Sequence, residues 1–454
     1  MIVHVEERGN ISGLTDAQNQ QIWRDVGIQL TRILLSKGEI INQEIESIEE
    51  IIENINKQRE WLHSQNIDEL LEFFAKLGKY WAENFSKEIG VNSKHLISFL
   101  SKENLGKKLD ISLRGNRSVL EKFMDLNDPK LLFHAQPRGI VVHWIAGNVD
   151  ILGVFSVVQA IITKNVSIIK APSKYELLLK LIGSIKEVKT EKILGSDLLK
   201  CIEIVYVNRD DQKNQKLLSE NADVRIAWGG EEAVKSILSL PKSPFSEDII
   251  YGPKYSYAII DEESLSKNAD KISQRIAMDV SMFDQYACSS PHTIFVESDD
   301  QKIIESFAEK IAKSLDNVNR ILIPKNNTSP DKALEILDIR AEYELKGKVI
   351  SSSGTEWTVI TSDRKNLAKP TFSRVIHIRK LNREELKKEN SSRKIQTIAI
   401  VMEQEKRYEI IDKLTLLAGD RCPNVGNMSL FDSPWDGMFG MDRMVRWVTT
   451  YKIQ

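Results

Sequence analysis

Residues 137–174, PRGIVVHWIAGNVDILGVFSVVQAIITKNVSIIKAPSK, decide the fold. The run 139–145 is apolar and rich in β-branched residues, and such a run predicts a buried strand. Residues 149–163 then predict a helix, and residues 166–170 predict a second strand. A strand, a helix and another strand in this order predict a βαβ unit with two parallel strands.

The same stretch raises the question of a membrane span, because residues 139–162 are long enough to cross a bilayer. His143, Asn148 and Asp150 lie near its middle, however, and polar or charged side chains are costly in hydrocarbon. A second apolar run follows at once at 166–169. We therefore favour a buried strand, turn and helix, and we expect no membrane span.

Strands and helices continue to alternate downstream. The predicted elements are a helix at 174–188, a strand at 202–207, a helix at 209–220, a strand at 223–228 and a helix at 230–240. The right-handed crossover rule makes this a doubly wound, Rossmann-like α/β sheet with helices on both faces. Ligands bind beyond the carboxyl ends of such strands, which here are the turn at 146–148, the run 170–174 and the pair 229–230.

The first 125 or so residues are predicted to be helical. Thr15 or Asp16 is expected to cap a helix, and the apolar positions of that helix are Ile22, Val26, Leu30 and Leu34. Further helical patterns cover 43–62, 67–87 and 92–104.

A second block of alternating elements spans residues 261–420. Its predicted elements are a helix near 264–282, a strand at 292–297, a helix at 300–316, strands at 373–379 and 396–402, and a helix at 404–418. We therefore divide the chain into a helical N-terminal region with a Rossmann-like domain (1–260), a second αβ domain (261–420) and a C-terminal segment (421–454). The Gly, Met and Trp content of this segment predicts that it docks back or contributes to oligomerisation.

The composition excludes several classes of protein. Of 454 residues, 63 are Lys or Arg and 65 are Asp or Glu, so the net charge of −2 gives no basic signal for nucleic acid. The three cysteines, Cys201, Cys288 and Cys422, are too few and too scattered for a disulfide framework or a zinc site, and we expect no metal. The N-terminus lacks the basic and apolar regions of a signal peptide, so we expect a cytoplasmic location.

Familiar catalytic motifs are absent, and one cysteine stands in a suggestive place. The chain has no G-x-G-x-x-G, no Walker A loop, no G-x-S-x-G and no HExxH. Cys288 lies in SMFDQYACSSPHTIFVE (281–297), between a predicted helix and a predicted strand, where a loop can place a thiol at the mouth of a cleft. A lone cysteine is most often a small core residue, and spacing alone does not rank Cys288 above Cys201 or Cys422.

The order of these features resembles the aldehyde dehydrogenase superfamily. A strand and the Asn148 turn, a strand ending at Lys170, Gly229-Gly230 after another strand, and then Cys288 follow one another as in that superfamily. Within it, the segments IAWGGEEAV, IIYGPKYSYAII, FDQYACSSPH and IQTIAIV resemble LuxC-type acyl-CoA reductases. The resemblance covers residues 110–454. It implies an aldehyde dehydrogenase-like α/β fold, with a Rossmann-like cofactor domain, an αβ catalytic domain and a helical N-terminal region.

The resemblance also implies a mechanism. Cys288 would be the nucleophile that attacks an acyl thioester and forms an acyl-enzyme. Asn148 matches the superfamily's oxyanion-hole asparagine, and its amide would act together with the backbone N–H of Cys288. On its residue type alone, Asn148 is equally expected as a turn residue.

Two glutamates of the superfamily are missing here. The glutamate that activates water in hydrolytic members falls on Ile250, and the one that binds the nicotinamide ribose falls near Pro370. An apolar side chain at position 250 is no base, so the acyl-enzyme is expected to react with a thiol or be reduced rather than be hydrolysed.

The expected cofactor is NADPH. The superfamily run Lys-Pro-Ser-Glu is replaced by Lys170-Ala171-Pro172-Ser173-Lys174, which puts a cation where the usual glutamate would repel a 2′-phosphate. Lys170, Ser173, Lys174, Gly229 and Gly230 are the expected cofactor-binding residues. The alternative for the two lysines is a pair of surface residues flanking a strand end.

We weigh three functions. The first is NADPH-dependent reduction of a fatty acyl-CoA or acyl-protein thioester to the aldehyde, as in bacterial luminescence. The second is a CoA-acylating aldehyde dehydrogenase working in the oxidative direction, and the third is a non-catalytic scaffold that binds an acyl carrier. The resemblance further implies an acyl-protein synthetase as partner and a homo-oligomer.

Overall fold

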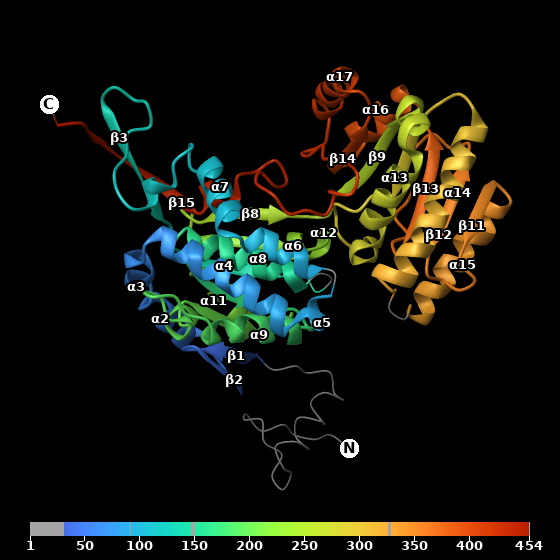
Figure 1. Ribbon diagram of the computed structural model, residues 1–454. Helices are drawn as coiled ribbons and strands as arrows, with labels where there is room; N and C mark the ends of the chain where they lie inside the picture. Colours follow the sequence, from blue (N-terminus) through green and yellow to red (C-terminus); the bar gives the residue numbers. More distant parts are fainter. Residues whose placement is uncertain (1–30, 91, 146, 148–149, 326–327, 454) are drawn as a thin grey trace, which may run out of the picture.

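The computed structural model describes residues 31–90, 92–145, 147, 150–325 and 328–453 (Figure 1). Its larger sheet has the strand order β2-β1-β6-β5-β4-β7-β8. These strands are β1 (Arg32–Ser36), β2 (Glu39–Glu44), β4 (Ile140–Trp144), β5 (Val166–Lys170), β6 (Ile202–Tyr206), β7 (Val224–Trp228) and β8 (Glu247–Tyr251). The strands from β4 to β8 run parallel, which confirms the predicted Rossmann-like sheet.

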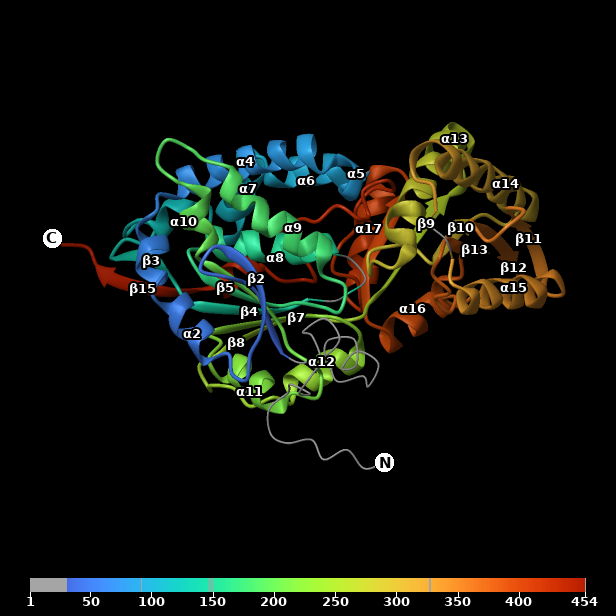
Figure 2. The ribbon, with the colours of Figure 1, turned by 90° about the horizontal axis from the view of Figure 1, so that it is seen from below.

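Helices cover both faces of this sheet (Figure 2). One face carries α4 (Ile67–Asn84), α8 (Asp150–Ile162) and α9 (Glu176–Gly183), and the other carries α11 (Gln212–Glu220) and α12 (Glu231–Leu238). The remaining helices of this part are α2 (Glu49–Asn56), α3 (Arg59–Ser64), α5 (Ser86–Ile89), α6 (Asn92–Leu100), α7 (Lys102–Ser112), α10 (Gly195–Leu199) and the short η1 (Arg117–Leu120) and η2 (Ser184–Glu187). β4 is buried along its whole length because helices cover it from both sides.

The N-terminal region is less helical than the sequence suggested. β1 and β2 form an antiparallel hairpin, and β1 also pairs with β6 at the edge of the sheet. The helical pattern at 43–62 is divided between the end of β2, α2 and α3. The prediction was wrong here because pairing with β6 outweighs the local pattern, and Leu34, predicted to be helical, lies in β1. Thr15, Asp16, Ile22, Val26 and Leu30 lie outside the described residues.

A second sheet has the order β11-β12-β13-β10-β9-β14. Its strands are β9 (Tyr255–Asp261), β10 (Thr293–Glu297), β11 (Gly347–Ser351), β12 (Thr358–Ser362), β13 (Val375–Lys380) and β14 (Ile395–Val401). Its helices are α13 (Glu262–Ser281), η3 (Met282–Gln285), α14 (Gln301–Asn317), η4 (Val318–Leu322), α15 (Pro330–Glu344), α16 (Arg383–Ser392) and α17 (Gln404–Thr415). The sequence patterns missed β8, β9, β11, β12, α15 and α16.

Side chains of β9 alternate between two cores. Ala258 and Ile260 pack with α13 and α14 on one face, whereas Tyr257 and Ile259 pack with α16 and α17 on the other. This alternation follows from the two-residue period of a strand. The change from the first sheet to the second takes place at residues 252–254, close to the division at 260 that we predicted from the sequence; the domain division itself remains a prediction.

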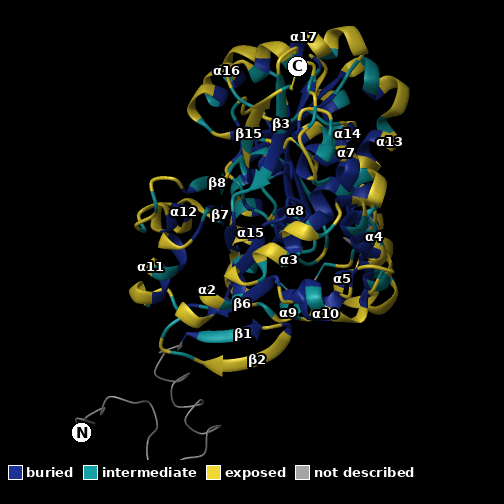
Figure 3. Cartoon of the chain, turned by 90° about the vertical axis from the view of Figure 1, so that its left-hand side faces the viewer, coloured by how far each residue is buried: buried dark blue, intermediate teal, exposed yellow. Residues whose placement is uncertain are grey.

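The C-terminal segment returns to the first part of the chain. After α18 (Gly440–Arg443), β15 (Val445–Tyr451) pairs antiparallel with β3 (Leu131–Pro137), and the two strands extend away from the larger sheet (Figure 1). Figure 3 shows that buried residues gather in the sheets and the inward faces of the helices, whereas β2 is exposed throughout. Among the described residues, no helix is long and apolar enough to cross a membrane.

Candidate active site

The carboxyl ends of parallel strands bring the predicted cofactor-binding residues to one edge of the larger sheet. β5 ends at Lys170 and β7 ends at Trp228, on opposite sides of β4. A Cβ atom on Gly147 would lie 3.3 Å from Cβ of Pro172, so the turn after β4 abuts the run after β5. This edge is therefore a topological switch point, where doubly wound sheets bind ligands. Asn148 itself lies outside the described residues.

The two lysines differ in exposure. Lys170 is half-buried, its Nζ lies 6.0 Å from the ring centroid of Tyr206, and burial lowers the pKa of its ammonium group. Ser173 and Lys174 are exposed. Within the described part of the chain, neither lysine pairs with a carboxylate. Both ammonium groups are thus available to an anion at this edge.

Gly229 and Gly230 form the turn between β7 and α12. Gly230 is exposed, and no atom lies within 4 Å of the position that a Cβ would take. Trp228, the residue before the turn, stacks against Tyr251 at the end of β8, with ring centroids 3.9 Å apart. The turn consequently leaves room for a ligand to approach the backbone ahead of a helix N-terminus.

Cys288 lies in the loop between η3 and β10, at the amino edge of the second sheet. Ser256 at the start of β9 donates a hydrogen bond of 2.7 Å from Oγ to the carbonyl oxygen of Cys288. The same Oγ accepts a bond of 3.2 Å from the N–H of Thr397 in β14. The short connection 252–254 joins the carboxyl end of β8 to the start of β9. The charge of Asp436 acts both on Tyr251, at the carboxyl end of β8, and on the Cys288 thiol, so this edge of the first sheet adjoins the loop that carries the thiol.

The backbone before Cys288 is held in an unusual conformation. Phe283, Asp284 and Gln285 have φ values of 53°, 48° and 64°, in the left-handed region that non-glycine residues rarely occupy. Asp284 accepts a bond of 2.6 Å from Nε of the buried Arg374. Gln285 donates from Nε2 to the carbonyl oxygens of Pro291 and Val375 at 2.8 and 3.1 Å. Such strain persists only where the surroundings fix it, and it often marks functional sites.

Electrostatics alone do not single out Cys288. Burial raises the pKa of Cys288 and of Cys201 to about 12 and that of Cys422 to about 11. The charge of Asp436 raises the pKa of Cys288 further, while a hydrogen bond from the Gln396 side chain and the charge of Lys254 lower it. What distinguishes Cys288 is therefore its polar neighbours and its place between the sheets.

These neighbours come from three distant segments. Gln396 in β14 donates from Nε2 to Oδ1 of Asp436 in the C-terminal segment. Nζ of Lys254 lies 2.6 Å from Oδ2 of Asp420 and 3.6 Å from Oδ2 of Asp436. The sequence patterns gave no role to Gln396, Asp436 or Lys254, although Gln396 and Lys254 lie in the segments IQTIAIV and IIYGPKYSYAII that carry the family resemblance.

An aromatic cluster adjoins this group through Trp435, the neighbour of Asp436. Ring centroids are 4.6 Å apart for Trp435 and Phe431, 5.3 Å for Phe431 and Phe155, and 4.3 Å for Phe155 and Phe99. The rings come from α6, α8 and the C-terminal segment. They form an apolar wall that joins the N-terminal helices to the C-terminal segment.

The structure shows the surroundings of Ile250 and Pro370, the two positions at which the superfamily glutamates are missing. Ile250 is half-buried in β8, and Pro370 is half-buried between β12 and β13. Among the leading influences on the pKa of the Cys288 thiol, the carboxylate is that of Asp436. Over the same residues, no group of three or more His, Cys, Asp or Glu side chains is arranged to hold a metal ion.

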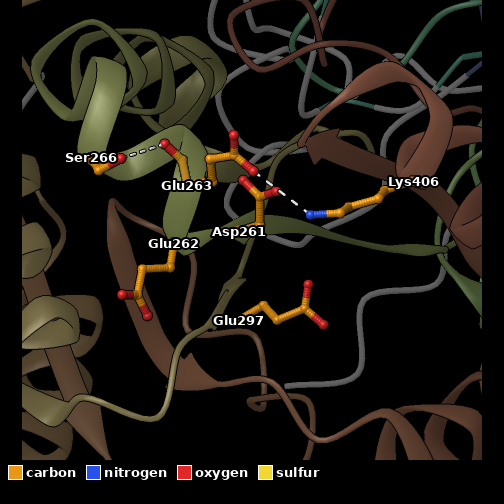
Figure 4. A pocket seen from close by; sticks show the side chains of 6 residues that line it. All are labelled: Asp261, Glu262, Glu263, Ser266, Glu297 and Lys406. Atoms are coloured by element: carbon orange, nitrogen blue, oxygen red, sulfur yellow. Dashed lines mark hydrogen bonds and ion pairs between the residues drawn. The ribbon is translucent and has the colours of Figure 1, made fainter.

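A separate acidic pocket lies at the opposite end of the second sheet (Figure 4). It is lined by Asp261, Glu262, Glu263, Ser266, Glu297 and Lys406. Asp261 and Glu297 end β9 and β10, whereas Cys288 precedes β10. The pocket is therefore distinct from the cysteine site.

Comparison with known proteins identifies the family of this chain. The family model for acyl-CoA reductase (LuxC) matches residues 43–447. A long-chain acyl-protein thioester reductase of Aliivibrio fischeri is 28% identical over 343 residues, covering 74% of this chain and 68% of the relative. A protein of the same name from Photobacterium phosphoreum is 25% identical over 410 residues, covering 85% and 80%.

Solved structures of low identity share the fold. An aldehyde dehydrogenase from Brucella melitensis biovar abortus gives a TM-score of 0.68 at 12% identity, covering 93% of this chain and 94% of that chain. A 3,6-anhydro-L-galactose dehydrogenase gives 0.65 at 14% identity, covering 93% and 96%. These matches confirm the predicted aldehyde dehydrogenase-like fold. The chain belongs to the acyl-CoA reductase (LuxC) family of oxidoreductases.

Proposed function

We propose that this protein is an NADPH-dependent reductase of fatty acyl thioesters that forms an acyl-enzyme on Cys288. The observation that carries the proposal is the position of Cys288. Its loop lies at the amino edge of the second sheet and adjoins the switch-point edge of the first near residues 252–254. A nucleophile and a dinucleotide site that adjoin in this way suit transfer of hydride to an acyl group.

The chemistry assigned to the chain begins with the Cys288 thiolate. It attacks the thioester carbonyl carbon, the new C–S bond forms, and the donor thiolate leaves and takes up a proton. When bound, NADPH would supply the hydride that reduces the acyl group. The resulting thiohemiacetal on Cys288 loses the sulfur as the aldehyde forms, which regenerates the thiolate. Asn148 and the backbone N–H of Cys288 remain the proposed oxyanion donors.

The residues of the switch-point edge fit an NADPH cofactor. Lys170 and Lys174 present two ammonium groups without carboxylate partners among the described residues, and Ser173 beside them is exposed. Cations in this place favour a 2′-phosphate. The open turn at Gly229 and Gly230 precedes the N-terminus of α12, which suits a pyrophosphate. Two glyceraldehyde-3-phosphate dehydrogenases that share the fold have been solved with NADP.

The fatty acyl specificity rests on the aromatic cluster and on the relatives. Phe99, Phe155 and Trp435 are buried and Phe431 is half-buried, so these rings form an apolar lining next to the cysteine site. Burial of each methylene of a chain against such a lining contributes about 0.8 kcal/mol. The relatives are named for acyl-protein thioesters, so we propose an acyl-protein donor supplied by a synthetase partner, with acyl-CoA as the alternative. A homo-oligomer, a cytoplasmic location and a role in luminescence remain predictions.

The test is NADPH oxidation, measured at 340 nm, with acyl-CoAs of increasing length and with a fatty acyl thioester of a carrier protein. Cys288→Ala should abolish oxidation, whereas Cys422→Ala, which removes another half-buried thiol, should retain it. Mass spectrometry of the wild-type protein without NADPH should show one acyl adduct on Cys288. Activity retained by a folded Cys288→Ala variant would exclude the thiol as nucleophile. Absence of any adduct from either donor would favour the scaffold, and faster turnover of aldehyde with CoA and NADP⁺ would favour the oxidative direction.

A further inference from the structure

Gln396 and Asp436 form a buried polar pair beside the loop that carries Cys288. Gln396 is fully buried and Asp436 is 6% exposed. The segments that carry them, β14 and the turn after Trp435, are about 40 residues apart in the sequence, and they meet only in the folded chain. Backbone hydrogen bonds of 3.0 and 2.9 Å between Trp435 and Met438 close that turn. The tertiary structure thus places a carboxylate against a buried amide beside the nucleophile.

The carboxylate decides which way the amide points. A carboxylate only accepts hydrogen bonds, so the atom of Gln396 that faces Oδ1 of Asp436 is the nitrogen Nε2. Nε2 carries two hydrogens, and the second is available to the Cys288 sulfur. Oγ of Ser256 donates to the carbonyl oxygen of Cys288 and accepts from the N–H of Thr397, the residue after Gln396, so β14 lies against the cysteine loop. A donor on Gln396 acts there to lower the pKa of the thiol.

This arrangement leaves polar atoms unsatisfied. Oε1 of Gln396 and Oδ2 of Asp436 are buried and have no hydrogen-bond partner among the described residues. Buried polar atoms without partners cost stability, so a pair kept for the fold alone would be poorly designed. Lys254, whose Nζ lies 3.6 Å from Oδ2, partly offsets the charge of Asp436.

We propose that Gln396 donates a hydrogen bond to the sulfur of Cys288 during acyl transfer, and that Asp436 is a positioning residue that holds the Gln396 amide in the orientation this requires. The role assigned here rests on the proposed function of Cys288. Stabilising a thiolate in this way assists both its formation and its departure from the thiohemiacetal.

Asp436 has two effects on the thiol, and they have opposite signs. Its negative charge raises the pKa of Cys288, whereas its hold on Gln396 supports the bond that lowers this pKa. Removing the charge while keeping the shape therefore separates the two. The other charged or titratable groups that act on Asp436, or on which it acts, are Lys254, Asp420, Arg421 and Tyr251.

The experiment measures the rate of iodoacetamide alkylation of Cys288 from pH 6 to pH 10, with the modified residue located by peptide mass spectrometry. It uses the full chain of the wild type and of Asp436→Asn, Asp436→Leu, Gln396→Met and Asp420→Asn. Asp436→Asn removes the charge but keeps the oxygen that accepts from Gln396, whereas Asp436→Leu removes both. A lost hydrogen bond to a charged group corresponds to roughly a tenfold change. At pH 8, Gln396→Met should alkylate about tenfold more slowly than the wild type, and Asp436→Leu about tenfold more slowly than Asp436→Asn, with profiles displaced to higher pH. Asp420→Asn removes a carboxylate from Lys254 but leaves the bond between Gln396 and Asp436 intact, so its alkylation should not be slower than that of the wild type.

Equal alkylation rates in Asp436→Leu and Asp436→Asn would overturn the positioning role, because the charge of Asp436 alone would then explain its effect on the thiol. If circular dichroism shows that Asp436→Leu is unfolded, Gln396→Met decides, because alkylation of this variant at the wild-type rate would refute a hydrogen bond from Gln396 to the sulfur. Alkylation needs neither substrate nor cofactor. A reductase activity that survives Cys288→Ala would therefore refute the proposed function but leave the alkylation result unchanged. Wild-type alkylation rates in the variants would refute the role of Gln396 and Asp436 but leave the proposed function unchanged.

Discussion

Glu203 provides a test of the part of the fold that the sequence patterns missed. It lies in β6, is 1% exposed, and is covered by the turn of the hairpin β1–β2. Its Oε1 accepts a bond of 3.2 Å from the N–H of Lys37, and its Oε2 has no partner among the described residues. Burial raises the pKa of this carboxyl from 4.5 to about 7, against the weaker opposing effects of Ser36 and Lys37.

The raised pKa fixes the sign and the size of a pH effect. The folded protein holds the proton of Glu203 more tightly than the unfolded chain, so this group contributes its full stability below pH 4.5 and loses it as the pH rises through 7. A shift of this size corresponds to about 3 kcal/mol of unfolding free energy between pH 4.5 and pH 8.5. Glu203→Gln keeps the acceptor for Lys37 but never ionises, so it should escape this loss.

Urea unfolding at pH 4.5 and pH 8.5 measures the effect. Relative to the wild type, Glu203→Gln should gain about 3 kcal/mol between the two pH values. Glu50→Gln is the matched control, because Glu50 is an exposed acid that pairs with Lys37 beside the same turn, and it should show no gain as the pH rises. A free-energy difference between Glu203→Gln and wild type that stays constant with pH would show that the hairpin does not bury this carboxyl.

Three further predictions concern the site and its supports. Arg225→Lys should lower the free energy of unfolding by about 3 kcal/mol in urea titrations, because lysine cannot replace the two bonds of 2.6 and 2.9 Å to Asp248. Asp284→Ala should lower it by about 3–5 kcal/mol, since the buried Arg374 loses its carboxylate, and a loss below about 1 kcal/mol would contradict this. Lys174→Glu should reduce the ratio of kcat/KM for NADPH to that for NADH about tenfold, and an unchanged ratio would show that Lys174 does not face the 2′-phosphate.

The central α/β elements could be predicted from the sequence. β4, α8, β5, β6 and β7 have local signals, because strands covered on both faces are continuous apolar runs and the crossover helices have clear ends. The motifs around Gly229 and Cys288 then sufficed for the family, since they keep their order along the chain. The strands β2 and β11 lie at sheet edges, and β1 and β12 are their antiparallel partners. All four were missed because pairing with distant strands outweighs a weak local pattern.

The surroundings of the candidate nucleophile were decided only by the tertiary structure. The sequence determined that a cysteine follows a helix and precedes a strand, and the family resemblance implied that Ile250 stands where hydrolytic members have an acid. It could not determine that Gln396 and Asp436 meet beside that cysteine, because each is an ordinary polar residue in its own segment. Their effect on the thiol depends on distance, burial and the direction of one amide group, and these arise only when separate elements pack together.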